Sequence, residues 1–239
     1  MIRSFFYFLK LIAYWMIFFT LYRVIFLLIY PGRIPEGKTS EALMVFLYAL
    51  RLDASTITYL IMIPLILWAI QQFAKQNFLN RINHFYNLGM ISAITVVCIS
   101  NIVMYGIWND LLNFHTLFYF VSLAKIFPYL TTLHFIGIGI GVAIIIAIFV
   151  LLFRVMILMV LPYSTGKLIY KLIIPPVIFI VLFFTVRGGT QQMPINESFA
   201  SYSDIKFIND VSINPAWHLV HMTMAAIEEK QDDKLKNEK

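Results

Sequence analysis

Five apolar stretches dominate this sequence and constrain its fold more than any other feature. They cover residues 11–30, 54–71, 88–108, 135–153 and 168–186. A helix needs about 20 mostly apolar residues to cross about 30 Å of hydrocarbon, because it rises about 1.5 Å per residue. The sequence therefore predicts an all-α integral membrane protein, a bundle of five transmembrane helices with interfacial helices and a short extracytoplasmic helix near the C-terminus.

The composition excludes a soluble globular protein, because 61% of the residues are hydrophobic and only 13% are charged. In soluble domains about 45–50% of the residues are apolar and about 25% are charged. The net charge of +6 does not indicate nucleic-acid binding, since the basic residues are dispersed between apolar stretches. Residues 1–186 hold 12 Lys/Arg and 4 Asp/Glu, whereas residues 187–239 hold 6 and 8. We expect a membrane domain at 1–186 and a water-facing juxtamembrane linker and helix at 187–239.

The distribution of Lys and Arg around the five stretches predicts the orientation of the chain. Cytoplasmic loops of membrane proteins carry an excess of these residues. With the N-terminus inside, the cytoplasmic side holds seven and the outer loops hold four: Arg3, Lys10, Lys75, Arg81, Arg154, Lys167 and Lys171 against Arg33, Lys38, Arg51 and Lys125. We therefore predict a multi-pass protein of the cytoplasmic membrane, with residues 187–239 on the outer side.

Two other stretches have intermediate character. Residues 40–50 are apolar enough for an interfacial lead-in to the second span, with Ser40 and Glu41 suited to a helix start. Residues 111–127 are nearly continuously apolar and either form a sixth span or an interfacial or re-entrant helix. We favour the second interpretation, because a sixth span would leave very short links to its neighbours.

Charged residues near the span ends are the candidate functional residues. Arg23 lies inside the first stretch, where a charge costs about 2.5–3.5 kcal/mol. Either it is a buried cation that pairs with Asp53 or a lipid phosphate, or its long side chain extends to the headgroups. Asp53 begins the second stretch. Either it caps that helix, or it orients Arg23 or Arg51 while Arg51 binds a phosphate.

Other residues suggest packing and capping roles. Gly137 and Gly141 form a small-xxx-small pair that lets a second helix approach. Ser100 and Asn101, in the third stretch, are expected to form interhelical hydrogen bonds. Asn214-Pro215 has the form of an N-cap followed by a first-turn proline.

His218 and His221, three residues apart on the expected C-terminal helix, have a spacing that a metal could use. No third ligand lies near them in the sequence, so we expect solvent-facing or interfacial histidines and no metal site. The sequence also shows no nucleophile together with a set of metal ligands, so we predict no catalytic residue in this chain.

Five segments of the sequence carry characteristic polar residues: Arg23 followed by Val-Ile-Phe-Leu-Leu-Ile-Tyr, Leu50-Arg51-Leu52-Asp53-Ala54-Ser55, Arg187-Gly188-Gly189, Pro194-Ile195-Asn196 and Ile213-Asn214-Pro215-Ala216-Trp217. Together they resemble the landmarks of one family, the lipoteichoic-acid-synthase-like phosphoglycerol transferases of the alkaline phosphatase/sulfatase superfamily, in the form found in Bacteroidota. The likeness is to the membrane domain of these proteins and extends over essentially the whole sequence.

The resemblance implies a five-span domain of a bacterial cytoplasmic membrane that anchors an extracytoplasmic catalytic domain and presents a lipid substrate to it. In that domain a threonine nucleophile and a divalent metal, typically manganese, would act on glycerol phosphate esters. This sequence ends at Lys239, where the linker to such a domain is expected. The expected partners are therefore an anionic glycerophospholipid and a catalytic domain, encoded separately or missing by truncation, and no cofactor is expected in this chain.

The lipid hypothesis has specific candidates. Arg23, Arg51 and Arg187 each lie near the outer end of a span, and Arg suits bidentate contacts with phosphate. With Asp53 as their orienting group, they form the predicted headgroup site, whereas three independent side chains reaching the headgroups are the alternative. The competing function is a non-enzymatic membrane scaffold that binds a partner through its outer helix. A small transporter is disfavoured, because buried charge is sparse.

Overall fold

The computed structural model describes residues 2–74, 77–113, 132–157, 160–163, 167–189 and 195–237. All regular structure in these ranges is helical. The long helices are α1 (Ile2–Ile29), α4 (Leu50–Gln71), α5 (Asn77–Trp108), α7 (Thr132–Met156), α8 (Leu168–Arg187) and α10 (Pro215–Asn237). The short ones are η1 (Pro31–Arg33), α2 (Thr39–Leu43), α3 (Val45–Tyr48), η4 (Glu197–Ala200) and α9 (Lys206–Ser212).

Five helices of the described chain are long and apolar enough to cross a membrane. They are α1, α5, α7, α8 and the continuous unit Thr39–Gln71, which combines α2, α3 and α4 and is called the α4 unit below. Each corresponds to one of the five stretches expected from the sequence. The expected bounds were shorter in places: α5 begins at Asn77, eleven residues before the apolar stretch. Its first turns carry polar residues, so hydropathy alone could not detect them. The stretch at 111–127 lies almost entirely outside the described residues, so its path stays a prediction.

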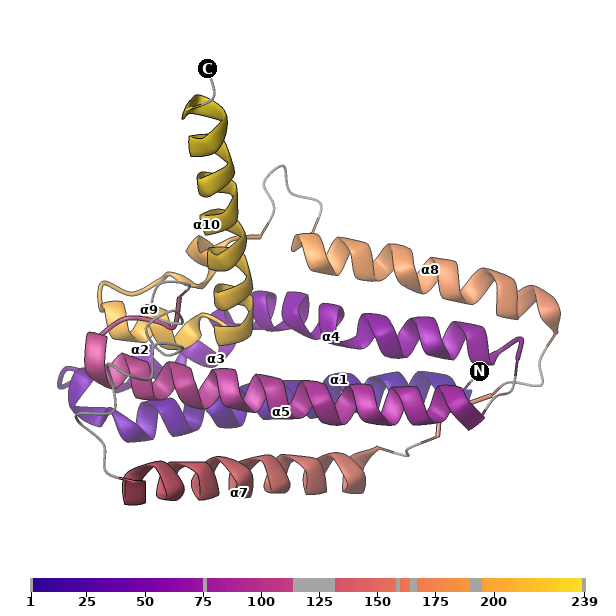
Figure 1. Ribbon diagram of the computed structural model, residues 1–239, viewed down its shortest axis with the longest axis horizontal. Coiled ribbons are helices and arrows are strands. Elements are labelled where there is room, and N and C mark those ends of the chain that lie inside the picture. Colours follow the sequence, from indigo (N-terminus) through magenta and orange to yellow (C-terminus); the bar gives the residue numbers. More distant parts are fainter. Residues whose placement is uncertain are drawn as a thin grey trace.

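The bundle is built around α4, which packs against α1, α5 and α8. In Figure 1, α7 and α8 lie on opposite sides of the central helices, α7 beside α5 and α8 beside α4. In the most apolar 18-residue window of each helix, 61% of the residues are buried in the α4 unit but only 6% in α8. The outward side of α8 is therefore a continuous apolar surface, which is what contact with lipid tails requires.

Local sequence signals explain where the long helices end. Pro31 follows the end of α1, and its missing backbone N–H and fixed φ favour a helix end at this place. Helix α8 ends in a Schellman motif: the N–H groups of Gly188 and Gly189 donate to the carbonyls of Thr185 and Phe184, at 3.1 and 2.9 Å. Gly188 has a φ of +85°, a conformation that favours glycine.

The segment after α8 folds back onto one end of the bundle. Helix α9 packs against α1 and α3, and α10 packs against α4 and α5. Phe207 of α9 sits between Phe26 and Tyr105, with ring centroids 5.6 Å from each. Tyr202 stacks on Tyr48 at 4.0 Å. Helix α10 then leaves the bundle roughly perpendicular to the long helices, at the end opposite the N-terminus (Figure 1).

Candidate site at a buried ion pair

A two-pronged ion pair joins α1 to α4 inside the bundle. The guanidinium of Arg23 donates from Nη1 to Asp53 Oδ2 at 2.7 Å and from Nη2 to Asp53 Oδ1 at 2.8 Å. Arg23 is 1% exposed and Asp53 is 3% exposed. Parallel bonds of this kind fix both distance and orientation, and removal from water makes them far stronger than a surface pair.

The same carboxylate also holds the start of α10. Asn214 donates from Nδ2 to Asp53 Oδ1 at 2.8 Å, while its Oδ1 accepts from the backbone N–H groups of Ala216 and Trp217. Nη2 of Arg23 further donates to the carbonyl of Ser212 at 3.3 Å. The expected N-cap at Asn214 is confirmed, and its second role is to connect the turn between α9 and α10 to the ion pair.

Two alternatives weighed from the sequence are wrong. Arg23 does not extend to the headgroups, because its side chain is buried and bonded to Asp53. Asp53 does not cap α4: its own N–H already donates to the carbonyl of Ala49 within the helical turn, and its carboxylate binds Arg23 and Asn214. The prediction that Arg23 pairs with Asp53 is confirmed.

This geometry limits the chemistry that Asp53 can perform. Its Oδ1 accepts two hydrogen bonds and its Oδ2 accepts one, all from buried donors. A carboxylate held in this way is a positioning group rather than a general base, since its lone pairs face the protein. Among the described residues, the Nε of Arg23 has no hydrogen-bond partner, so the pair already tolerates one unsatisfied donor.

The other two predicted arginines lie at the same end of the bundle, nearer its surface. The guanidinium carbon of Arg51 lies 5.2 Å from the ring centroid of Phe199, in η4. The backbone carbonyl of Arg187 accepts from the N–H of Ile195 at 3.0 Å. Ser55 donates to the carbonyl of Val186 at 3.0 Å, which places the end of α8 against the start of α4. Arg51 and Arg187 are exposed, whereas Arg23 is internal.

Further polar contacts connect α5 to α1 and to α9. Asn101 donates to the hydroxyl of Tyr22 at 2.7 Å, and its Oδ1 accepts from the N–H of Leu112 at 2.7 Å. The expected interhelical role of Asn101 is thereby confirmed. Tyr105 donates to Asp210 at 2.8 Å, and Lys206 pairs with Asp210 and Asp110. Burial raises the pKa of Asp210 above its usual range, while Tyr105 and Lys206 act in the opposite direction.

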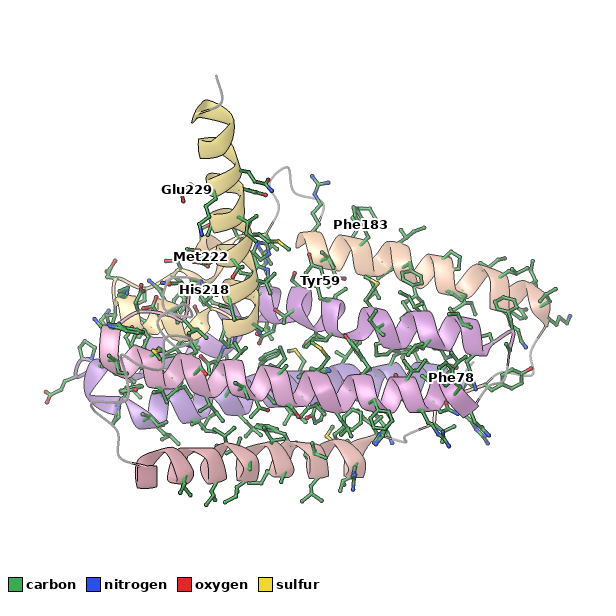
Figure 2. The ribbon with its side chains drawn as sticks, viewed as in Figure 1. Tyr59, Phe78, Phe183, His218, Met222 and Glu229 are labelled. Carbon is green, nitrogen blue, oxygen red and sulfur yellow. The ribbon has the colours of Figure 1, made fainter. Side chains whose placement is uncertain are left out.

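One of the two histidines differs from expectation, and the other, His221, is partly exposed. His218 is buried rather than solvent-facing, and its Nδ1 lies 2.5 Å from Glu197 Oε1. His221 stacks on Trp217, with ring centroids 3.7 Å apart. The contact with Glu197 was missed because 21 residues separate the partners, and no local pattern signals such a pair. Figure 2 shows His218 near the base of α10.

Gly137 and Gly141 have open space around them: a Cβ at either position would meet nothing within 4 Å. No described helix of this chain uses them for close approach, so their packing role stays a prediction. In the part of the chain that the structure describes, no three His, Cys, Asp or Glu side chains gather in a group suited to a metal.

Comparison with known proteins gives no neighbour. No family model, no curated protein and no solved structure matches this chain.

Proposed function

We propose that this chain is the membrane-anchoring, lipid-presenting domain of a lipoteichoic-acid-synthase-like phosphoglycerol transferase that acts at the outer face of the cytoplasmic membrane. One observation carries the proposal. Arg23, the segment around Asp53 and the segment around Asn214 are the landmarks of the resemblance, and they meet in one hydrogen-bonded unit. These segments are far apart in sequence, and their shared buried interaction supports a common structural role at that end of the bundle.

That purpose is to fix the chain beyond the last span. The turn between α9 and α10 is held by Asp53 from α4 and Arg23 from α1. The direction in which α10 leaves the bundle is therefore set by α1 and α4. A catalytic domain connected through α10 would be held at a defined height above the membrane, and a divalent metal, expected to be manganese, would belong to that domain.

The lipid substrate would sit beside this anchor. Arg51 and Arg187 are exposed at the same end of the bundle, while Arg23 and Asp53 hold α1 and α4 in register beneath them. An anionic glycerophospholipid offers one phosphate, for which guanidinium groups are the preferred partners. We assign lipid contact to Arg51 and Arg187 and a positioning role to Arg23 and Asp53.

Native mass spectrometry of the detergent-released chain with phosphatidylglycerol tests this assignment. We expect Arg51→Ala to reduce the number of retained lipids. Arg33→Ala is the matched control, because Arg33 lies at the same end but contacts the rings of Tyr30 and Tyr105. Equal lipid loss in the two variants would leave only a general attraction of basic residues to anionic lipid.

One observation favours the alternative, a non-enzymatic scaffold that binds a partner through α10. Beyond its first turn, α10 exposes a stripe of apolar side chains: Val220 is 50% exposed, Met224 56% and Ile227 48%. Co-purification distinguishes the two functions. A sulfatase-like domain recovered with the intact chain supports the first proposal, whereas recovery of an unrelated partner that is lost in Met224→Asp supports the scaffold.

A further inference from the structure

At the opposite end of the bundle, near the N-terminus, the structure contains a cavity of about 680 Å³. Its walls come from α1, α4, α5 and the chain that follows α7. The lining residues include Arg3, Phe6, Lys10, Asn77, Asn80 and Val160. The volume is within the range of about 300–1,000 Å³ that is typical of small-molecule sites.

Two hydrogen bonds hold the walls of this cavity in place. Asn83 of α5 donates to the hydroxyl of Tyr7 at 2.8 Å, which ties α1 to α5. The N–H of Leu161 donates to Asn80 Oδ1 at 3.0 Å, which fastens the chain after α7 to α5. The cavity is therefore bounded by side chains that are fixed to one another.

Two cations line the α1 side. Arg3 and Lys10 are seven residues apart, or about 10.5 Å along the helix, and both are exposed. Side chains on a helix tilt toward its N-terminus. The tilt brings the ammonium of Lys10 closer to the membrane depth at which Arg3 lies. With 28 residues, α1 is about 42 Å long, longer than the hydrocarbon layer of about 30 Å. Its first turns therefore reach headgroup depth.

Among the residues that the structure describes, no acidic side chain pairs with Arg3 or Lys10 at that end. The sequence contains no Asp or Glu at residues 1–35, 54–109 or 111–196. The remaining acidic residues lie near the Asp53 end of the bundle or in α10 and the tail that follows it. Arg3 and Lys10 are therefore available to an anionic ligand at this end of the bundle.

We propose that this cavity binds an anionic glycerophospholipid of the leaflet at the N-terminal end, a site separate from the one near Asp53. The phosphate lies between Arg3 and Lys10, with the polar side chains of Asn77 and Asn80 facing the glycerol. One acyl chain follows the apolar wall, where Phe6 is 52% exposed and Val160 is 62% exposed. A free phosphate would use the two cations but leave this apolar wall uncovered.

Native mass spectrometry of the full chain in mixed phosphatidylglycerol and phosphatidylcholine tests the site. The double variant Arg3→Gln/Lys10→Gln should retain phosphatidylglycerol at least fivefold less than the unmodified chain. Arg81→Gln/Arg154→Gln is the matched control, because it removes two exposed cations from α5 and α7 that do not line the cavity. It should change retention by less than twofold.

Equal loss in the two double variants would overturn the proposal, because it would show a general basic field rather than a site. Displacement of the lipid by excess inorganic phosphate would overturn it as well, because the acyl chain would then contribute nothing. If the double variant does not fold, Lys10→Gln and Lys10→Arg replace it, and retention must fall only in the first. The loss caused by Arg3→Gln/Lys10→Gln should be the same in the presence and absence of Arg51→Ala, so the two lipid proposals fail independently.

Discussion

Removing the carboxylate of Asp53 is the sharpest test of the buried ion pair. In Asp53→Leu, Arg23 loses both of its short bonds and keeps only the carbonyls of Phe19 and Ser212, each at 3.3 Å. Its Nε already has no partner. Breaking one partner of a buried pair costs about 3–5 kcal/mol, because an uncompensated charge stays inside the protein. We expect a loss of this size in the free energy of unfolding.

The magnitude is measured by reversible unfolding in mixed micelles, with sodium dodecyl sulfate as the denaturant and circular dichroism as the signal. A double-mutant cycle isolates the pair. Arg23→Met/Asp53→Leu should be less destabilised than the sum of the two single variants, since it removes both charges together. Lys38→Gln serves as the surface control, because Lys38 pairs with Glu41 where water has access. Additive losses, or a loss in Asp53→Leu no larger than in the control, would refute the reasoning.

Three further predictions follow from other parts of the structure. Gly188→Ala should destabilise the protein by at least about 1–2 kcal/mol, because φ is +85° and the new Cβ would lie 2.8 Å from that of Ile195. In the same unfolding assay Gly32→Ala should be neutral, because a Cβ at Gly32 would meet no atom within 4 Å. Burial lowers the pKa of His221, so NMR titration of its ring should give a midpoint below the usual 6.5. The free energy of unfolding should fall as the pH drops through 6.5, because the unfolded chain then binds more protons than the folded chain. A titration midpoint above 6.5 would contradict this. Reporters fused to the two ends of the chain should give cytoplasmic activity at the N-terminus and outer activity at the C-terminus, and activity on one shared side would disprove the five-span topology.

Hydropathy alone was enough to predict the helices of the bundle. An apolar stretch of 18 or more residues has few alternatives to a membrane helix, so α1, α4, α5, α7 and α8 could each be located. The pairing of Arg23 with Asp53 was also within reach as one of two interpretations, because a charge inside an apolar stretch requires a partner. Helix capping by Asn214 followed from the proline after it.

The polar contacts between distant segments could not be predicted. The bond from Asn214 to Asp53 spans 161 residues and the contact of His218 with Glu197 spans 21, and no periodicity encodes either separation. The capping alternative for Asp53 is wrong because the preceding helices α2 and α3 continue almost directly into α4, so no free helix end exists there. The cavity near Arg3 was missed because it forms only when four segments meet.

The bond between Asn214 and Asp53 has a consequence for the order in which the protein is made. Ribosomes add about 5–20 residues per second, so Asn214 follows Asp53, 161 residues earlier, by roughly 8–32 seconds. Throughout that interval Arg23 and Asp53 are in the membrane with each other but without the turn that covers them. The turn between α9 and α10 therefore completes, late in synthesis, the interior formed by the first two spans.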